Sequence, residues 1–150
     1  MEDSRQIENL IYRYAEHIDN GDLEAVAELF REAEIVSSEH NSRLAGFDEV
    51  LKMYQLSCRL HETTGTPLTK HITTNVIIEL DDSHAEASAR SYYTVIQATG
   101  SLPLQPIISG RYKDRFRKVE GVWIFVRREM FVDLIGDCSA HLLYDVQSLK

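Results

Sequence analysis

The chain has 150 residues, of which 43% are hydrophobic and 27% charged, and its formal net charge is −8; these values are ordinary for one globular domain. The acidic balance disfavours nucleic acid and anionic membrane surfaces as partners, because both are bound through basic patches. No apolar run approaches the roughly 18 residues of a membrane span, and the polar start of the chain shows no secretion signal. We therefore expect a single cytoplasmic domain over residues 1–150, with Cys58 and Cys138 as reduced thiols.

A first helix is predicted by apolar residues that recur at spacings of three and four, namely Ile7, Leu10, Ile11, Tyr14, Ala15 and Ile18. Asp3 and Gln6 have the spacing of a capping box at its start. Asn20-Gly21 should end it, because both residues tolerate the left-handed conformation of a helix end. Asp22 can then cap a second short helix.

The middle of the chain predicts a short strand at residues 34–38, a polar turn at 39–43 and a third helix at about 47–60. From residue 70 the period changes to two, which predicts strands at 71–80, 85–98, 107–118 and 122–134. The turns between them are short, so we expect an antiparallel meander. The tail from Gly136 gives no prediction of secondary structure, although Leu142, Leu143 and Tyr144 indicate that it packs on something. Helices followed by such a sheet indicate an α+β fold with the helices on one face.

Three segments resemble the SnoaL-like branch of the nuclear-transport-factor-two-like superfamily: residues 14–22 (YAEHIDNGD), 70–75 (KHITTN) and 121–128 (GVWIFVRR). The resemblance extends from about Arg5 to Leu142. It implies a cone in which a strongly curved antiparallel sheet and three N-terminal helices surround a pocket, and it implies a homodimer or homotrimer. Functions within this superfamily range from dehydratases, cyclases and epoxide hydrolases to dioxygenase small subunits and proteins without chemistry, so the fold alone does not decide the function.

Asp19 and His71 stand where dehydratase-like members of the family carry a catalytic pair. The resemblance implies that the two meet inside the pocket, where the histidine removes a proton and the aspartate orients and charges it. The chemistry is sound because histidine titrates near neutral pH, and a carboxylate partner fixes its tautomer and stabilises the imidazolium. The structural alternative is that Asp19 is a helix-end turn residue and His71 a polar residue at a strand edge.

Other candidates follow from the same resemblance. Tyr14 is expected to point into the pocket and donate a hydrogen bond to the substrate, although it lies on the predicted buried stripe. Arg128 is the candidate for holding an anionic or leaving group, and Arg127 should face the opposite way because strand side chains alternate. Five further residues could line the pocket, although aromatic residues in such a sheet are commonly core: Tyr54, Tyr92, Tyr93, Trp123 and Met130.

The chain also departs from sites of the scytalone dehydratase type. Ile18 stands where those sites carry a tyrosine, and the strand at 85–98 has no histidine where they use a second one. The first short strand offers Ser37, Ser38 and Glu39 in place of another tyrosine. These departures leave the substrate open.

The leading hypothesis is a lyase or isomerase acting on a small, fairly apolar molecule, cyclic compounds included. The six histidines have no metal-ligand spacing and no phosphate loop or nucleophile elbow is present, so no metal or cofactor is implied. One alternative is a non-catalytic ligand-binding or accessory protein resembling a dioxygenase small subunit. Another is a cyclase or an epoxide hydrolase; the latter needs an Asp–Arg–Asp set drawn from Asp19, Arg90 or Arg111, and Asp114 or Asp133.

Overall fold

The computed structural model describes residues 2–144. Its elements are α1 (Asp3–Asp19), α2 (Leu23–Leu29), β1 (Glu34–Ser37), the 3-10 turn η1 (Ser38–His40), β2 (Ser42–Ala45), α3 (Gly46–Ser57), β3 (Thr69–Leu80), β4 (Glu86–Gln97), β5 (Gln105–Val119) and β6 (Val122–Ile135). The predicted helices and strands are all present, within a few residues of their expected bounds. The exception is the stretch at 39–43, which contains η1 and the start of β2 instead of a simple turn.

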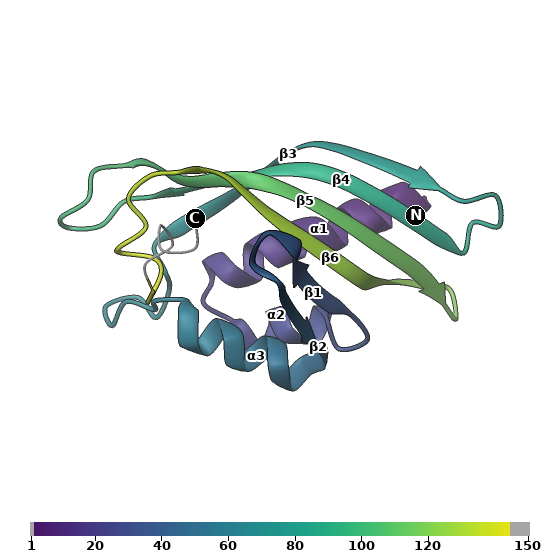
Figure 1. Cartoon of the computed structure of the whole chain (residues 1–150), viewed down its shortest axis with the longest axis horizontal. Coiled ribbons are helices and arrows are strands. Elements are labelled where there is room, and N and C mark those ends of the chain that lie inside the picture. The colour runs from purple at the N-terminus through teal and green to yellow at the C-terminus, as the bar shows by residue number, and fades with distance from the viewer. Residues whose placement is uncertain (1, 145–150) are drawn as a thin grey trace.

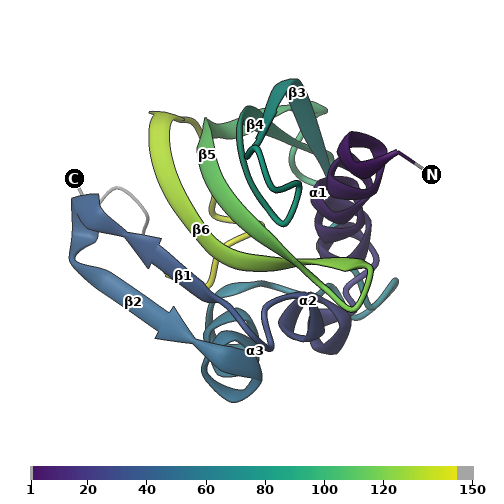
Figure 2. The ribbon, with the colours of Figure 1, turned by 90° about the vertical axis from the view of Figure 1, so that its right-hand side faces the viewer.

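Six strands form one curved sheet in the order β2-β1-β6-β5-β4-β3. All neighbours are antiparallel except β1 and β6, which are parallel; the sheet is therefore mixed, and the expectation of a purely antiparallel sheet is wrong at this pair. The parallel pairing is possible because a long connection through α3 and the four strands β2–β5 separates β1 from β6. The three helices lie together on one face of the sheet (Figure 1), and the β1–β2 hairpin closes the side opposite α1 (Figure 2).

Register shifts bend the long strands around the helices. They occur between Thr74 and Ile77 where β3 meets β4, between Val95 and Ile96 of β4, and at two places in the β5–β6 pair. Each extra residue tightens the local twist and turns the strand. The result is the cone expected from the sequence, in which β5 and β6 are strongly curved (Figure 2).

The predicted apolar stripe of α1 faces the hydrophobic core. Ile7, Leu10, Ile11, Tyr14 and Ile18 are all buried beneath the sheet, and removal of such side chains from water is the main stabilising term of the fold. Asp22 caps α2 as predicted, by accepting a hydrogen bond from the backbone of the first turn.

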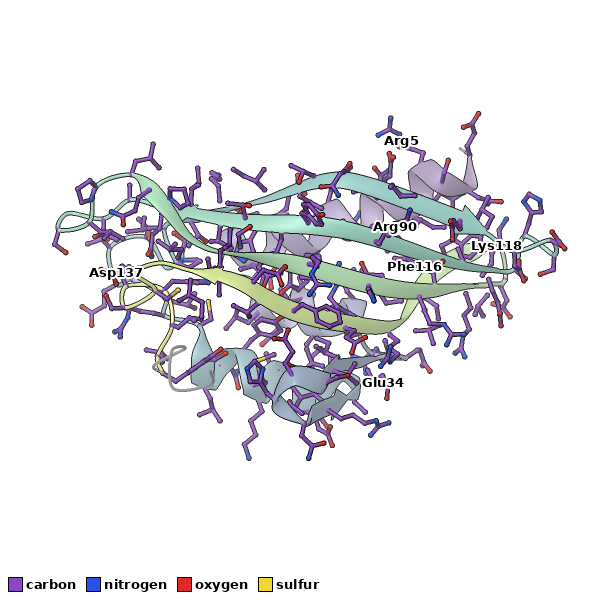
Figure 3. The ribbon with its side chains drawn as sticks, turned by 45° about the horizontal axis from the view of Figure 1, so that its top comes forward. Arg5, Glu34, Arg90, Phe116, Lys118 and Asp137 are labelled. Carbon is purple, nitrogen blue, oxygen red and sulfur yellow. The ribbon has the colours of Figure 1, made fainter. Side chains whose placement is uncertain are left out.

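The capping box predicted at the start of α1 is absent. Asp3 instead accepts hydrogen bonds from the Lys118 ammonium and the Trp123 indole, both at 2.9 Å. These contacts tie the start of α1 to the β5–β6 turn, at the end of the sheet far from Asp137 (Figure 3). No helix within residues 2–144 combines the length and the hydrophobicity needed to cross a membrane.

Candidate active site

Asp19 and His71 meet where the end of α1 passes the start of β3. The Asp19 carboxylate accepts three hydrogen bonds from this strand: from His71 Nδ1 at 2.7 Å, from the His71 backbone N–H at 2.8 Å and from the Thr69 hydroxyl at 2.9 Å. Both side chains of the pair are less than a tenth exposed. Burial raises the pKa of Asp19, but the hydrogen bonds and the charge of His71 outweigh it and hold that pKa below its usual value.

A close backbone approach brings these two elements together. Gly21 follows α1 in the left-handed region, and a Cβ built there would lie 2.2 Å from the carbonyl oxygen of Gly65. Only glycine fits both the conformation and the contact. The loop before β3 is thereby held against the end of α1, and the sequence signal Asn20-Gly21 is part of the site as well as a helix stop.

Asp19 also fixes the tautomer of His71. An ionised carboxylate only accepts hydrogen bonds, so the proton shared with Asp19 belongs to Nδ1 of the neutral ring. Nε2 then carries a lone pair, on a ring that forms part of the cavity wall. A neutral histidine in this tautomer can accept a proton at Nε2 from a group within hydrogen-bond reach.

The cavity inside the cone has a volume of about 460 Å³, within the usual range for small-molecule sites. Its wall is built from α1, α3, the β1–β2 hairpin, the inner face of β3–β6 and the C-terminal tail. Most of the wall is aliphatic or aromatic. The polar groups among the described residues of the wall are serine, tyrosine and histidine side chains and one thiol, that of Cys58.

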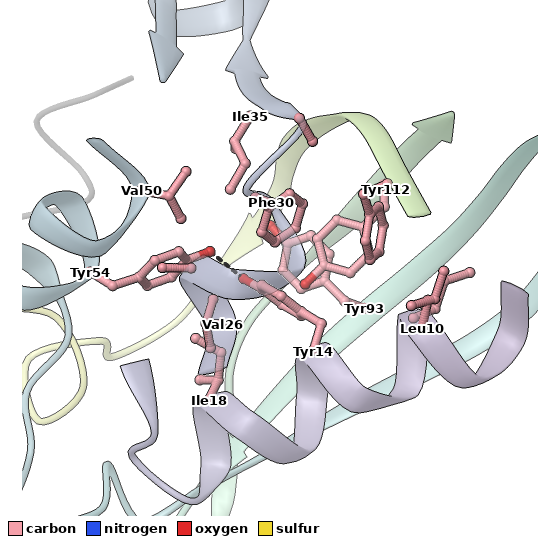
Figure 4. Packing of buried hydrophobic residues seen from close by; sticks show 14 of the residues in the cluster. Leu10, Tyr14, Ile18, Val26, Phe30, Ile35, Val50, Tyr54, Tyr93 and Tyr112 are labelled. Atoms are coloured by element: carbon pink, nitrogen blue, oxygen red, sulfur yellow. Dashed lines mark hydrogen bonds between the residues drawn. The ribbon is translucent and has the colours of Figure 1, made fainter. Parts of the chain in front are cut away.

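Two tyrosines face the cavity as a hydrogen-bonded pair. The hydroxyl oxygens of Tyr14 and Tyr54 are 2.5 Å apart (Figure 4). Burial raises the pKa of both phenols above the ordinary value for tyrosine, so both keep their protons at neutral pH. One of the two protons is used within the pair, which leaves the other available for a substrate oxygen.

Tyr93 and Tyr112 form a second aromatic wall, with stacked rings whose centroids are 4.5 Å apart. Gly110 makes this packing possible, because a Cβ at that position would lie 1.9 Å from the Phe131 carbonyl oxygen and 2.7 Å from the Tyr93 hydroxyl. The Tyr93 hydroxyl instead donates a hydrogen bond to that carbonyl. Tyr93 and Tyr54 thus line the cavity as expected, and so does Met130. Tyr112 was not among the candidates.

Arg128 does not face the cavity, which corrects its expected role. Its side chain is fully buried and makes two hydrogen bonds with Asp114, at 2.8 and 2.9 Å. The guanidinium lies 3.7 Å from the ring centroid of Tyr112 and 4.5 Å from that of Tyr14. The guanidinium therefore packs against both tyrosine rings and stabilises their positions. The predicted alternation holds, since Arg127 is on the other face and partly exposed.

Two expected cavity residues lie elsewhere. Tyr92 is on the outer face of the sheet and 54% exposed. Trp123 is buried, but it packs at the opposite end of the sheet and bonds to Asp3. Tyr92 points outward because side chains alternate along β4, whose inward positions carry Ser91 and Tyr93 instead.

His141 is a cavity residue that the sequence analysis missed. It lies in the tail after β6, and its ring centroid is 5.8 Å from that of His71. The tail is held by hydrogen bonds that the Gln97 amide and the His61 ring donate to the Ala140 carbonyl. Burial, followed by the nearby charge of His71, lowers the pKa of His141 to about 4. The apolar residues that follow it were the sequence signal that this tail packs on something.

The set required for an epoxide hydrolase does not assemble. Arg111 pairs with Asp133, and both are substantially exposed. Arg90 is also exposed and lies 3.7 Å from Glu79. Asp114 is committed to Arg128 and Asp19 to His71, so the sets proposed for this activity do not converge. Within residues 2–144, no three His, Cys, Asp or Glu side chains are grouped to hold a metal ion.

The family described as "SnoaL-like domain" matches residues 1–129 of this chain. Among solved structures, a protein from Novosphingobium aromaticivorans provisionally assigned as a scytalone dehydratase is 31% identical, with a TM-score of 0.70 over 95% of this chain and 88% of the other. Two further structures are similar in fold. One is an NTF2-like protein with a cystatin-like fold from the same organism (22% identity, TM-score 0.72, 98% and 88% covered). The other is a protein of unknown function with a cystatin-like fold from Nostoc punctiforme (24%, 0.71, 87% and 91%). No curated protein sequence matches.

Proposed function

This chain belongs to the SnoaL-like family, and from that premise we propose that it is a lyase or isomerase that removes a proton from carbon in a small apolar molecule, with His71 as the base. The observation that supports the proposal most is the contact between Asp19 and the Nδ1 side of His71, which leaves the other ring nitrogen as a lone pair at the cavity wall. A positioned general base contributes about 10²–10⁴ in rate.

Elimination of water from a β-hydroxy ketone illustrates the steps. His71 Nε2 takes a proton from the carbon between the carbonyl and the hydroxyl-bearing carbon, and the electron pair of that C–H bond becomes the new double bond. The C–O bond breaks, and the leaving hydroxide takes the proton held by His71, which forms water and returns His71 to its neutral state. Asp19 stabilises the transient imidazolium, and the free hydroxyl proton of the Tyr14–Tyr54 pair donates a hydrogen bond to an oxygen of the substrate.

The test uses 3-hydroxy-1-tetralone, whose dehydration yields 1-naphthol and is followed by fluorescence. The compound has a relevant ring system because one 31% identical structure carries the provisional name scytalone dehydratase. We expect His71→Ala to lower kcat/KM by about 10²–10⁴, whereas the matched control His17→Ala, on α1 outside the cavity wall, leaves it within about twofold. A His71→Ala variant within about threefold of the wild type would refute the proposal.

A binding protein without chemistry is the second candidate, and solvent exchange separates the two. If His71 is a base, it exchanges the acidic protons next to the carbonyl of 1-tetralone with deuterium from D₂O even though this ketone has no leaving group. Binding of 1-tetralone without such exchange would favour the binding protein.

Homodimer or homotrimer formation stays a prediction. It is supported by apolar side chains on the outer face of the sheet, where Ile72, Tyr92 and Leu134 are 41%, 54% and 69% exposed. Light scattering of the purified chain tests it, and a monomer at micromolar concentration would contradict it.

A further inference from the structure

The described wall of the cavity carries no Asp, Glu, Lys or Arg side chain. Arg128, the cation expected to face a ligand, is buried behind Tyr14 and Tyr112 and is already neutralised by Asp114. A carboxylate or phosphate that entered this space would lose its hydration without gaining a cation, which is strongly unfavourable. The wall therefore matches an uncharged ligand.

Among the described residues of this wall, His141 carries the fully buried side-chain polar atom that lacks a hydrogen-bond partner. Its Nδ1 is fully buried and has no partner among residues 2–144. A buried N–H without a partner is rarer in proteins than a buried lone pair, so the neutral tautomer with its proton on Nε2 fits this position best. An imidazolium would bury an unpaired N–H together with a charge, in keeping with the lowered pKa of this group.

His71 and His141, two of the three histidines in the described cavity wall, then have opposite hydrogen-bonding characters. His71 presents a lone pair because its proton is committed to Asp19, and His141 presents an N–H because its lone pair is buried. Their ring centroids are 5.8 Å apart at an interplanar angle of 72°. One small molecule can therefore meet an acceptor and a donor at adjacent points.

We propose that the cavity selects electrically neutral, mainly apolar molecules that carry a carbonyl oxygen, and that His141 donates a hydrogen bond to this oxygen. The proposal rests on the proposed function only for the identity of the site, because ligand selection does not require turnover. His141 is placed for this contact by the anchored tail, where Ala140 accepts bonds from Gln97 and His61 and the His141 carbonyl accepts from the Arg59 N–H at 2.7 Å.

The test is calorimetric binding of three bicyclic probes of similar size to the full chain at neutral pH. 1-Tetralone is neutral and has the carbonyl, tetralin lacks the oxygen, and 1-naphthoate carries a negative charge. We expect 1-tetralone to bind at least about 100-fold more tightly than 1-naphthoate, because a buried carboxylate without a partner is costly. None of these probes has a leaving group, so failed binding is distinguished from failed catalysis.

Two variants test the donor. His141→Phe keeps an aromatic ring without an N–H, and should weaken 1-tetralone about three- to tenfold, the effect of one hydrogen bond, while tetralin is unchanged. His141→Asn restores a donor and should recover part of this loss.

Each contrary result overturns a part of the proposal. Equal affinity for 1-naphthoate and 1-tetralone, or no binding of 1-tetralone at its solubility limit, overturns the selection of neutral ligands. Equal weakening of 1-tetralone and tetralin by His141→Phe overturns the hydrogen bond and leaves His141 as a packing residue.

Discussion

The buried pair of Arg128 and Asp114 predicts a large loss of stability when only one partner is removed. In Arg128→Met, the Asp114 carboxylate, which is 1% exposed, loses both hydrogen bonds of 2.8 and 2.9 Å. Breaking such a pair costs about 3–5 kcal/mol, chiefly because a charge stays buried without compensation. This is a large part of the roughly 5–15 kcal/mol that stabilises a typical domain.

Removing both charges should cost much less. The double variant Arg128→Met/Asp114→Leu leaves no buried ion, and apolar replacements of a buried pair are often close to neutral. We expect its free energy of unfolding to lie within about 2 kcal/mol of the wild type; part of this allowance covers the lost stacking of the guanidinium on Tyr112 and Tyr14.

Urea unfolding at neutral pH, followed by the fluorescence of Trp123, measures both effects. The matched control is Arg127→Met, the partly exposed neighbour on the other face of β6, where we expect a loss below about 1 kcal/mol. The reasoning is refuted if Arg128→Met costs under about 1 kcal/mol, or if the double variant is as unstable as Arg128→Met.

Three further predictions concern the site and its support. Asp19→Asn should lower turnover of 3-hydroxy-1-tetralone by about 10²–10⁴ and move the His71 proton from Nδ1 to Nε2 in nitrogen NMR spectra, whereas an unchanged tautomer would contradict the role of Asp19. The pKa of His141 is about 4 in the folded chain and about 6.5 when unfolded, so the unfolded state binds more protons between these values. The free energy of unfolding should therefore reach its full value above pH 6.5 and fall by about 3 kcal/mol as the pH drops to 4. In urea titrations, His141→Gln should reduce this dependence on pH. Asp19 does not contribute to it, because its pKa is lowered from 3.8 and its titration lies below this pH range. Gly110→Ala forces its Cβ against a backbone carbonyl at 1.9 Å and should cost more than about 2 kcal/mol, while Gly100→Ala, with open space around it, should cost under about 0.5 kcal/mol; similar losses for both would contradict the packing argument.

Local patterns were sufficient to predict most of the fold. The spacing of Ile7, Leu10, Ile11, Tyr14 and Ile18 identifies the inner face of α1, because a helix repeats every 3.6 residues whatever packs against it. The period of two after residue 70 likewise identifies the four long strands, and short turns make them antiparallel neighbours. The parallel contact of β1 with β6 has no such local signal, because it joins segments about 90 residues apart and depends on how the sheet curls.

The candidate site likewise has a part that the sequence predicted and a part that it did not. The resemblance pointed to Asp19 and His71, and their contact depends on segments with clear sequence marks, the Asn20-Gly21 stop and the start of β3. Whether a side chain on a curved sheet faces the cavity, the core or solvent depends on bulges and on what lies across the strand. The tertiary structure alone therefore decided that Arg128 forms a buried ion pair with Asp114, that Tyr92 points outward, and that the tail brings His141 beside His71. Helix and strand periods are properties of the local chain, whereas the composition of a cavity wall is a property of contacts between distant segments.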